Sequence, residues 1–169
     1  MKSTGNSLLT RFLSKPTHEQ RILIEALLLV ALTRFLIVFM PFKVLGRLIG
    51  RPQKVTQGLA FSGDRMICRA SVFSYDESAS QPGLTAQART IAKAVLAVSR
   101  RVPWQATCLV QASAGKIMLN RRGLPGSVYL GVNKTKNGKM EPHAWLTSDS
   151  VVILGGGELE KYSVVSAFT

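Results

Sequence analysis

The sequence has few of the residues from which catalytic and metal sites are built: two cysteines, two histidines and nine acidic residues among 169. Cys68 and Cys108 lie far apart and match no paired-cysteine framework, so we expect a reducing, cytoplasmic setting. A zinc site would need both cysteines to converge with His18 and His143 without any ligand-spacing motif. Residues 155–157 are glycines, but no Lys-Ser or Lys-Thr pair follows them, which argues against a phosphate-binding loop. We therefore expect no metal and no cofactor.

Acidic residues are too few to balance the basic ones, and the formal net charge is +13. Residues 1–54 carry nine basic and two acidic groups, and residues 84–122 carry seven basic and none acidic. Such a surface attracts acidic peptides, anionic lipid headgroups or nucleic acid. Solvated helix faces explain the same pattern without any partner.

Hydrophobic residues make up 46% of the chain, enough to fill the core of one domain. The longest apolar run, within residues 21–48, predicts a helix that Pro41 ends or kinks. Glu25 and Arg34 interrupt it, and each charge would be costly inside a bilayer. We expect this helix to pack on the rest of the protein or to lie at a membrane surface. The chain thus divides into an N-terminal helical region (1–52), a connector (53–83) and a core (84–169).

The sequence pattern of residues 84–169 predicts an α+β fold. Apolar residues recur at helical spacing from 84 to 98, and a second helix follows from Cys108 to Leu119, with Thr107 as N-cap and Gly123 in the left-handed position after its end. Alternating segments at 127–133, 140–147 and 150–154 predict an antiparallel sheet, with one more short strand near 66–73 in the connector.

Cys108 and His143 are the candidate catalytic pair. A thiol in the first turn of a helix is biased toward the thiolate, and an imidazole on a neighbouring strand supplies a base, as in papain-like sites. Trp145 falls on the same face of its strand as His143, where it would contact substrate or pack in the core. A buried inert cysteine and a structural histidine are the alternatives.

Four segments in order resemble the split form of the lasso-peptide biosynthesis B protein, a transglutaminase-like leader peptidase. They are Cys108-Leu-Val-Gln-Ala, Leu119-Asn-Arg-Arg-Gly-Leu-Pro125, Leu130-Gly-Val132 and His143-Ala-Trp-Leu, and Met40-Pro-Phe42 resembles the end of the first helix in that family. The resemblance implies a transglutaminase-like or papain-like core, a catalytic helix plus antiparallel sheet, with an N-terminal helical extension.

The activity implied by the resemblance is removal of the leader from a ribosomally synthesised precursor peptide. The implied partners are that precursor, a PqqD-like leader-recognition protein and a macrolactam cyclase; nucleic acid is not among them. Cys108 would be the nucleophile and His143 the base. Arg121 and Arg122 would suit an acidic leader or partner surface.

The third catalytic residue is where this sequence departs from the family. Members with a full triad carry an Asp on the strand after the histidine, but residues 151–157 hold no carboxylate. Asp149 is the nearest candidate and Glu158 the next, while a backbone carbonyl or a water would also orient the imidazole. Two other function classes stay open: a transglutaminase-like acyltransferase, and a non-catalytic basic module that binds membrane or nucleic acid.

Overall fold

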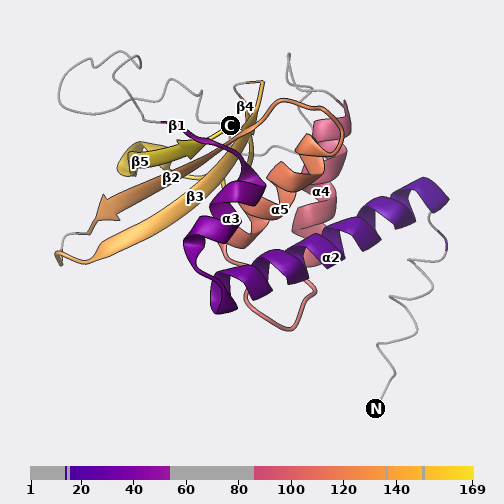
Figure 1. The fold of residues 1–169 in the computed structure, drawn as a ribbon, viewed down its shortest axis with the longest axis horizontal. Helices are drawn as coiled ribbons and strands as arrows, with labels where there is room; N and C mark the ends of the chain where they lie inside the picture. Colours follow the sequence, from indigo (N-terminus) through magenta and orange to yellow (C-terminus); the bar gives the residue numbers. More distant parts are fainter. Residues whose placement is uncertain (1–13, 15, 54–85, 136, 150) are drawn as a thin grey trace.

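A computed structural model describes residues 14, 16–53, 86–135, 137–149 and 151–169 of the chain. Four of its five strands follow the last α-helix in the chain, and the short strand β1 lies between the second and third helices (Figure 1). The helices are α2 (Thr17–Phe39), α3 (Phe42–Ile49), α4 (Ala86–Ser99) and α5 (Cys108–Asn120). The strands are β1 (Pro52–Gln53), β2 (Ser127–Lys134), β3 (Met140–Ser148), β4 (Val151–Leu154) and β5 (Ser163–Phe168), with a short 3₁₀ helix, η1 (Leu159–Lys161), before β5.

The N-terminal apolar run forms α2, and the predicted break at Pro41 is confirmed. Helix α2 stops at Phe39, Met40 is extended, and Pro41 is the residue before the first turn of α3. Proline cannot donate the backbone hydrogen bond that a continuing helix needs, whereas it is tolerated at a helix start. The chain therefore turns at this point, and α3 leads to β1.

Helices α4 and α5 agree with the periodicity of the core. The buried residues of α4 include Ala88, Ile91, Val95 and Val98, which follow the helical spacing predicted within residues 84–98. Thr107 precedes α5 with an extended backbone, but its side chain makes no capping hydrogen bond. Gly123 has φ 65, the left-handed conformation expected after the helix.

The sheet has the order β1-β5-β2-β3-β4, and all its pairs are antiparallel. Strands β2 and β3 form the expected hairpin, in which Gly131 lies opposite His143. Strand β5 returns to pair with β2 on one side and β1 on the other, a strand that the sequence pattern does not predict. The connector predicted at 53–83, with its strand near 66–73, lies outside the described residues apart from Gln53.

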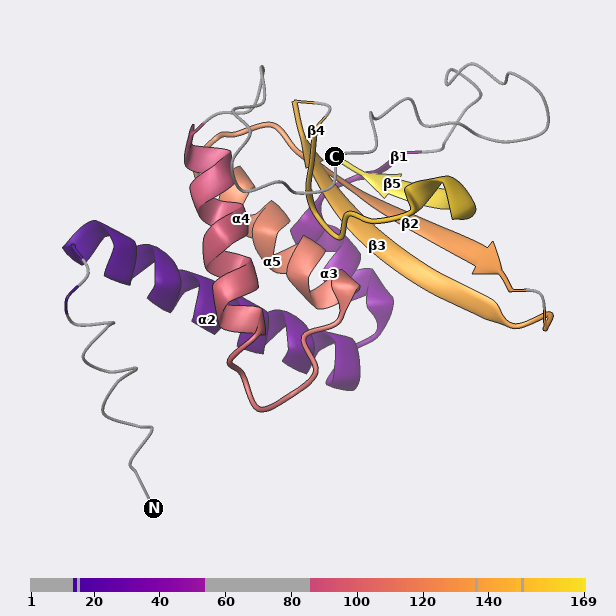
Figure 2. The same cartoon turned by 180° about the vertical axis from the view of Figure 1, so that it is seen from behind.

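One hydrophobic core unites the helices and the sheet. Helix α5 contacts β3 on one side and α2 on the other, and α4 packs beside it (Figures 1 and 2). Gly115 allows this close packing, because a Cβ there would lie 2.6 Å from Leu154 and 2.7 Å from Leu146. Buried residues of α2 and α3, such as Val30 and Leu45, belong to the same core cluster as those of α5. The N-terminal helices are thus packed against the core.

Candidate active site

The predicted nucleophile, Cys108, is the first residue of α5 and a free, half-buried thiol. The first N–H groups of a helix have no partner within the helix, and they carry the positive end of its dipole. A negative sulfur is favoured at this position. The local cause is the sequence itself, since the extended backbone of Thr107 starts the helix at the cysteine.

His143 lies on β3 within hydrogen-bonding reach of Cys108. Their hydrogen bond is the main cause that lowers the pKa of the Cys108 thiol, and backbone hydrogen bonds from Ala144 and Leu109 act in the same direction, against the opposing effect of burial. The same hydrogen bond raises the pKa of His143, again against burial. Both shifts favour a thiolate and an imidazolium side by side, the reactive form of a cysteine nucleophile.

The other side of the His143 ring is held by a backbone carbonyl. Nε2 lies 2.8 Å from the oxygen of Gly155, and this bond also raises the pKa of His143. Since a carbonyl only accepts, Nε2 carries a proton, and Nδ1 is the ring nitrogen left for Cys108. The Gly155 carbonyl therefore occupies the orienting position that an Asp side chain holds in a full triad.

The backbone at Gly155 is shaped for this contact. The glycine follows β4 with φ 71, and a Cβ there would lie 2.3 Å from the carbonyl oxygen of Ala144 and 3.0 Å from the Cα of Trp145. Pairing between β3 and β4 ends at Leu146 and Leu154, so the chain leaves the ladder at Gly155 and crosses close to β3. No other residue type fits this turn without displacing it.

Aromatic rings surround the imidazole. Tyr162 stacks on His143 with ring centroids 4.8 Å apart, and Trp145 lies at 6.2 Å on the same face of β3, as its spacing predicts. Trp145 is only 2% exposed and also stacks on Tyr129. It therefore packs around His143 and has little surface for the substrate contact that we expected of it.

Asp149 lies away from the imidazole. It is exposed in the turn between β3 and β4, six residues along an extended chain from His143, or about 20 Å at the usual rise per residue. Its φ of 49 is left-handed, which Asp tolerates well in turns. Glu158, the second candidate, pairs with Lys161. In this structure the contact to Nε2 of His143 is made by the Gly155 backbone carbonyl, the alternative that the sequence leaves open, and Asp149 is placed in the turn away from it.

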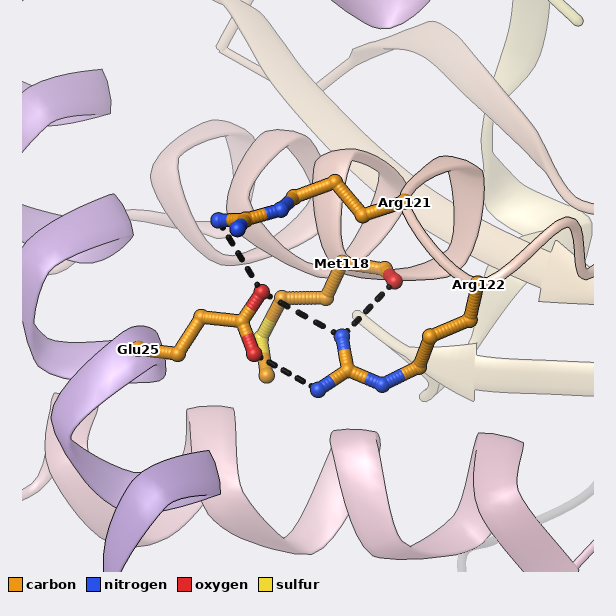
Figure 3. A network of polar contacts seen from close by, with 4 residues as sticks. All are labelled: Glu25, Met118, Arg121 and Arg122. Carbon is orange, nitrogen blue, oxygen red and sulfur yellow. Dashed lines mark hydrogen bonds and ion pairs between the residues drawn. The ribbon is translucent and has the colours of Figure 1, made fainter.

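The two predicted substrate-binding arginines contact the N-terminal helix instead. Arg122 donates to both carboxylate oxygens of Glu25, at 2.6 and 3.3 Å, and to the Met118 carbonyl at 3.0 Å, while Arg121 lies 3.2 Å from the same carboxylate (Figure 3). Both arginines follow the C-terminal end of α5, about 20 Å from Cys108 along the helix. This placement joins α2 to α5 and is far from the thiol.

Metal ligands do not gather anywhere in the part of the chain that the structure describes: no group of three or more His, Cys, Asp or Glu side chains is placed to hold an ion there. His18 is exposed at the start of α2, and Cys68 lies outside the described residues. The chemistry available at Cys108 and His143 is that of a thiolate with its acid–base partner.

A thiolate at a helix start, paired with an imidazole on an antiparallel sheet, is the arrangement typical of cysteine-dependent acyl-transfer enzymes. In agreement with this class, the family model of the transglutaminase-like superfamily matches residues 55–167, more than half of the chain. The protein belongs to this superfamily, which includes both cysteine peptidases and acyltransferases. No curated protein and no solved structure matches the chain. Helices α2 and α3 precede the matched range.

Sequence reasoning missed Gly155 and Tyr162. The glycine run at 155–157 carries no side chain that points to a role beside the imidazole, and a backbone carbonyl leaves no residue-type signal, since every residue has one. The position of Tyr162 depends on η1, which returns the chain toward His143 after β4.

Proposed function

We propose that this protein is a cysteine peptidase that removes the leader from a lasso-peptide precursor, acting with a PqqD-like leader-recognition protein and before a macrolactam cyclase. The observation that carries the proposal is the hydrogen-bonded series from Cys108 through His143 to the Gly155 carbonyl. The substrate class is supported by the resemblance of the segments around Cys108, Arg121 and His143 to the lasso B protein.

The first half of the reaction forms a thioester. The Cys108 thiolate attacks the carbonyl carbon of the scissile peptide bond, and the oxyanion that forms is stabilised by N–H groups at the start of α5. The His143 imidazolium then gives its Nδ1 proton to the departing nitrogen. The core peptide leaves with a free amino terminus, and the leader stays attached to sulfur through its carbonyl carbon.

The second half regenerates the enzyme. Neutral His143 takes a proton from a water molecule, which attacks the thioester carbon, and the thiolate leaves as the leader gains a carboxylate. Throughout both steps the Gly155 carbonyl accepts from Nε2. It keeps the ring oriented and stabilises its charged form, which is the role of the third residue in a triad.

The test is mass spectrometry of the precursor incubated with the full-length protein and its recognition partner in ¹⁸O-labelled water. We expect cleavage at one bond, one ¹⁸O atom in the new carboxylate of the leader, and no cleavage with Cys108→Ala. The matched control is Cys68→Ser, which changes the other cysteine and is expected to leave cleavage unchanged.

Two results would overturn the proposal. Intact precursor with the wild-type protein, when the recognition partner is shown to bind the leader, would exclude leader hydrolysis. Transfer of the leader to an added primary amine, with no label incorporated from water, would assign the site to the acyltransferases of the superfamily instead.

A further inference from the structure

Helix α2 is apolar on two opposite faces, and only one of them is covered by the residues that the structure describes. Its inner face is buried against α4 and α5 through residues such as Ala26, Val30 and Thr33. Its outer face exposes seven large apolar side chains: Ile24, Leu27, Leu28, Leu32, Phe35, Val38 and Phe39. Leu28 is 64% exposed and Phe39 70%. A continuous exposed apolar surface of this kind marks an interaction site for another protein or a membrane.

The spacing of these residues makes one stripe. Positions 24, 28, 32, 35 and 39 recur at intervals of three or four residues, which places them in line along the helix, and 27 and 38 lie beside them. Phe35 and Phe39 stack with ring centroids 4.8 Å apart, so they form one aromatic surface at the end of the stripe. We call these seven residues the outer stripe. It runs for about 22 Å at the usual helical rise.

The charges around the outer stripe are basic. Arg21 is exposed one turn before Ile24 on the same face, and Arg34 lies beside the stripe, one turn before Val38. Arg47 and Arg51 are exposed further along the chain, in and after α3. The acidic residues of α2 lie elsewhere: Glu19 is in the first turn, before the stripe, and Glu25 is bound by Arg121 and Arg122.

Length and composition alone would let α2 cross a membrane, with a mean hydropathy of 2.5 over its most apolar window. The packing opposes such a placement. One third of that window (33%) is buried inside the protein, and spanning would expose the inner core and separate Glu25 from Arg122. A helix that packs on the protein through one face and is apolar on the other is suited to lie in the plane of a membrane surface.

We propose that the outer stripe binds the surface of an anionic lipid bilayer. The apolar side chains enter the boundary between headgroups and acyl chains, while Arg21, Arg34 and Arg47 contact lipid phosphates. The net charge of +13 adds long-range attraction to such a surface. This inference does not depend on the reaction at Cys108.

The test is sedimentation of the full-length protein with vesicles of phosphatidylcholine, alone or mixed with phosphatidylglycerol. We expect binding to the mixed vesicles, weaker binding to phosphatidylcholine alone, and weakening with rising salt. Leu28→Glu with Phe35→Glu is expected to bind at least about tenfold more weakly, because two large apolar side chains no longer leave water. The matched control is Val165→Glu on β5, also at a well-exposed position (59%), which is expected to bind like the wild type.

Since the substituted side chains are exposed, the variants are expected to have the same urea concentration at the midpoint of unfolding as the wild type. Three results would overturn the proposal: no binding of the wild type to mixed vesicles; equal binding of the double variant; and a wild-type dimer in solution, by light scattering, that the double variant loses. The last result would assign the stripe to a second copy of the chain. If the wild type does not bind vesicles and the double variant no longer binds the recognition protein, the outer stripe would be assigned to that partner.

Discussion

Replacing Gly155 with alanine tests whether a backbone carbonyl acts as the third member of this site. The substitution has two costs. A non-glycine residue at φ 71 is strained by about 1–2 kcal/mol, and the new Cβ would lie 2.3 Å from the Ala144 carbonyl oxygen, so the backbone has to move by about an ångström to reach ordinary contact. That movement carries the Gly155 carbonyl away from Nε2 of His143.

The magnitude follows from the lost hydrogen bond. A hydrogen bond to a charged group contributes about 1.5–3 kcal/mol, which corresponds to a rate about 10- to 150-fold slower if the bond is lost in the transition state. The Gly155 carbonyl raises the pKa of His143, so its loss lowers that pKa and weakens the imidazolium that stabilises the thiolate. The pKa of Cys108 therefore rises in the variant.

The assay measures alkylation of Cys108 by iodoacetamide as a function of pH, beside leader cleavage and urea unfolding. Gly138→Ala is the matched control, because Gly138 also has a positive φ (76) but nothing lies within 4 Å of its added Cβ. We expect the alkylation midpoint to move to higher pH in Gly155→Ala alone. A folded Gly155→Ala protein with the wild-type midpoint and cleavage rate would refute the role of the carbonyl.

Three further outcomes are expected. The rate of leader cleavage should follow a bell-shaped pH profile. The rate rises through the lowered pKa of Cys108 as the thiolate forms, and it falls above the raised pKa of His143 as the imidazolium loses its proton. A profile with only one limb would contradict the paired assignment. Glu25→Gln should lower the free energy of unfolding by about 1 kcal/mol in urea, less so at high salt, and no change would mean that this ion pair is fully screened. Gly131→Ala should destabilise by about 1–3 kcal/mol and alter tryptophan fluorescence, because its Cβ would lie 2.8 Å from the Trp145 ring; unchanged stability and fluorescence would show that the ring can shift freely.

Local signals explain which parts of the fold could be predicted. Pro41 and Gly123 restrict the backbone at their own positions, so they indicate where helices end. The apolar residues of α4 recur with the helical period, so they indicate which face of the helix is buried. Cys108 and His143 were also accessible, since a cysteine after a helix-starting Thr and a histidine within an alternating strand are both local patterns.

The rest depends on contacts between distant segments. Strand β5 is short and begins after a 3₁₀ turn, and its place beside β2 is set by pairing across the sheet and not by its own composition. A basic pair such as Arg121 and Arg122 gives no sign of its partner in the sequence, so a substrate contact and a contact within the protein cannot be told apart there. That partner, Glu25, is 97 residues from Arg122. A sequence names candidate side chains such as Asp149, but it does not show which backbone carbonyl will face the imidazole.

The packing of α2 and α3 has a consequence for how this protein folds. The family match begins at residue 55, yet Ile22, Ala26, Val30, Leu45 and Ile49 fill the same core as α5. A fragment that starts at the family boundary would expose the apolar residues that these side chains cover. The boundary is therefore one of sequence similarity and not of cooperative folding, and α5 should unfold in a single transition with the N-terminal helices α2 and α3 that cover it.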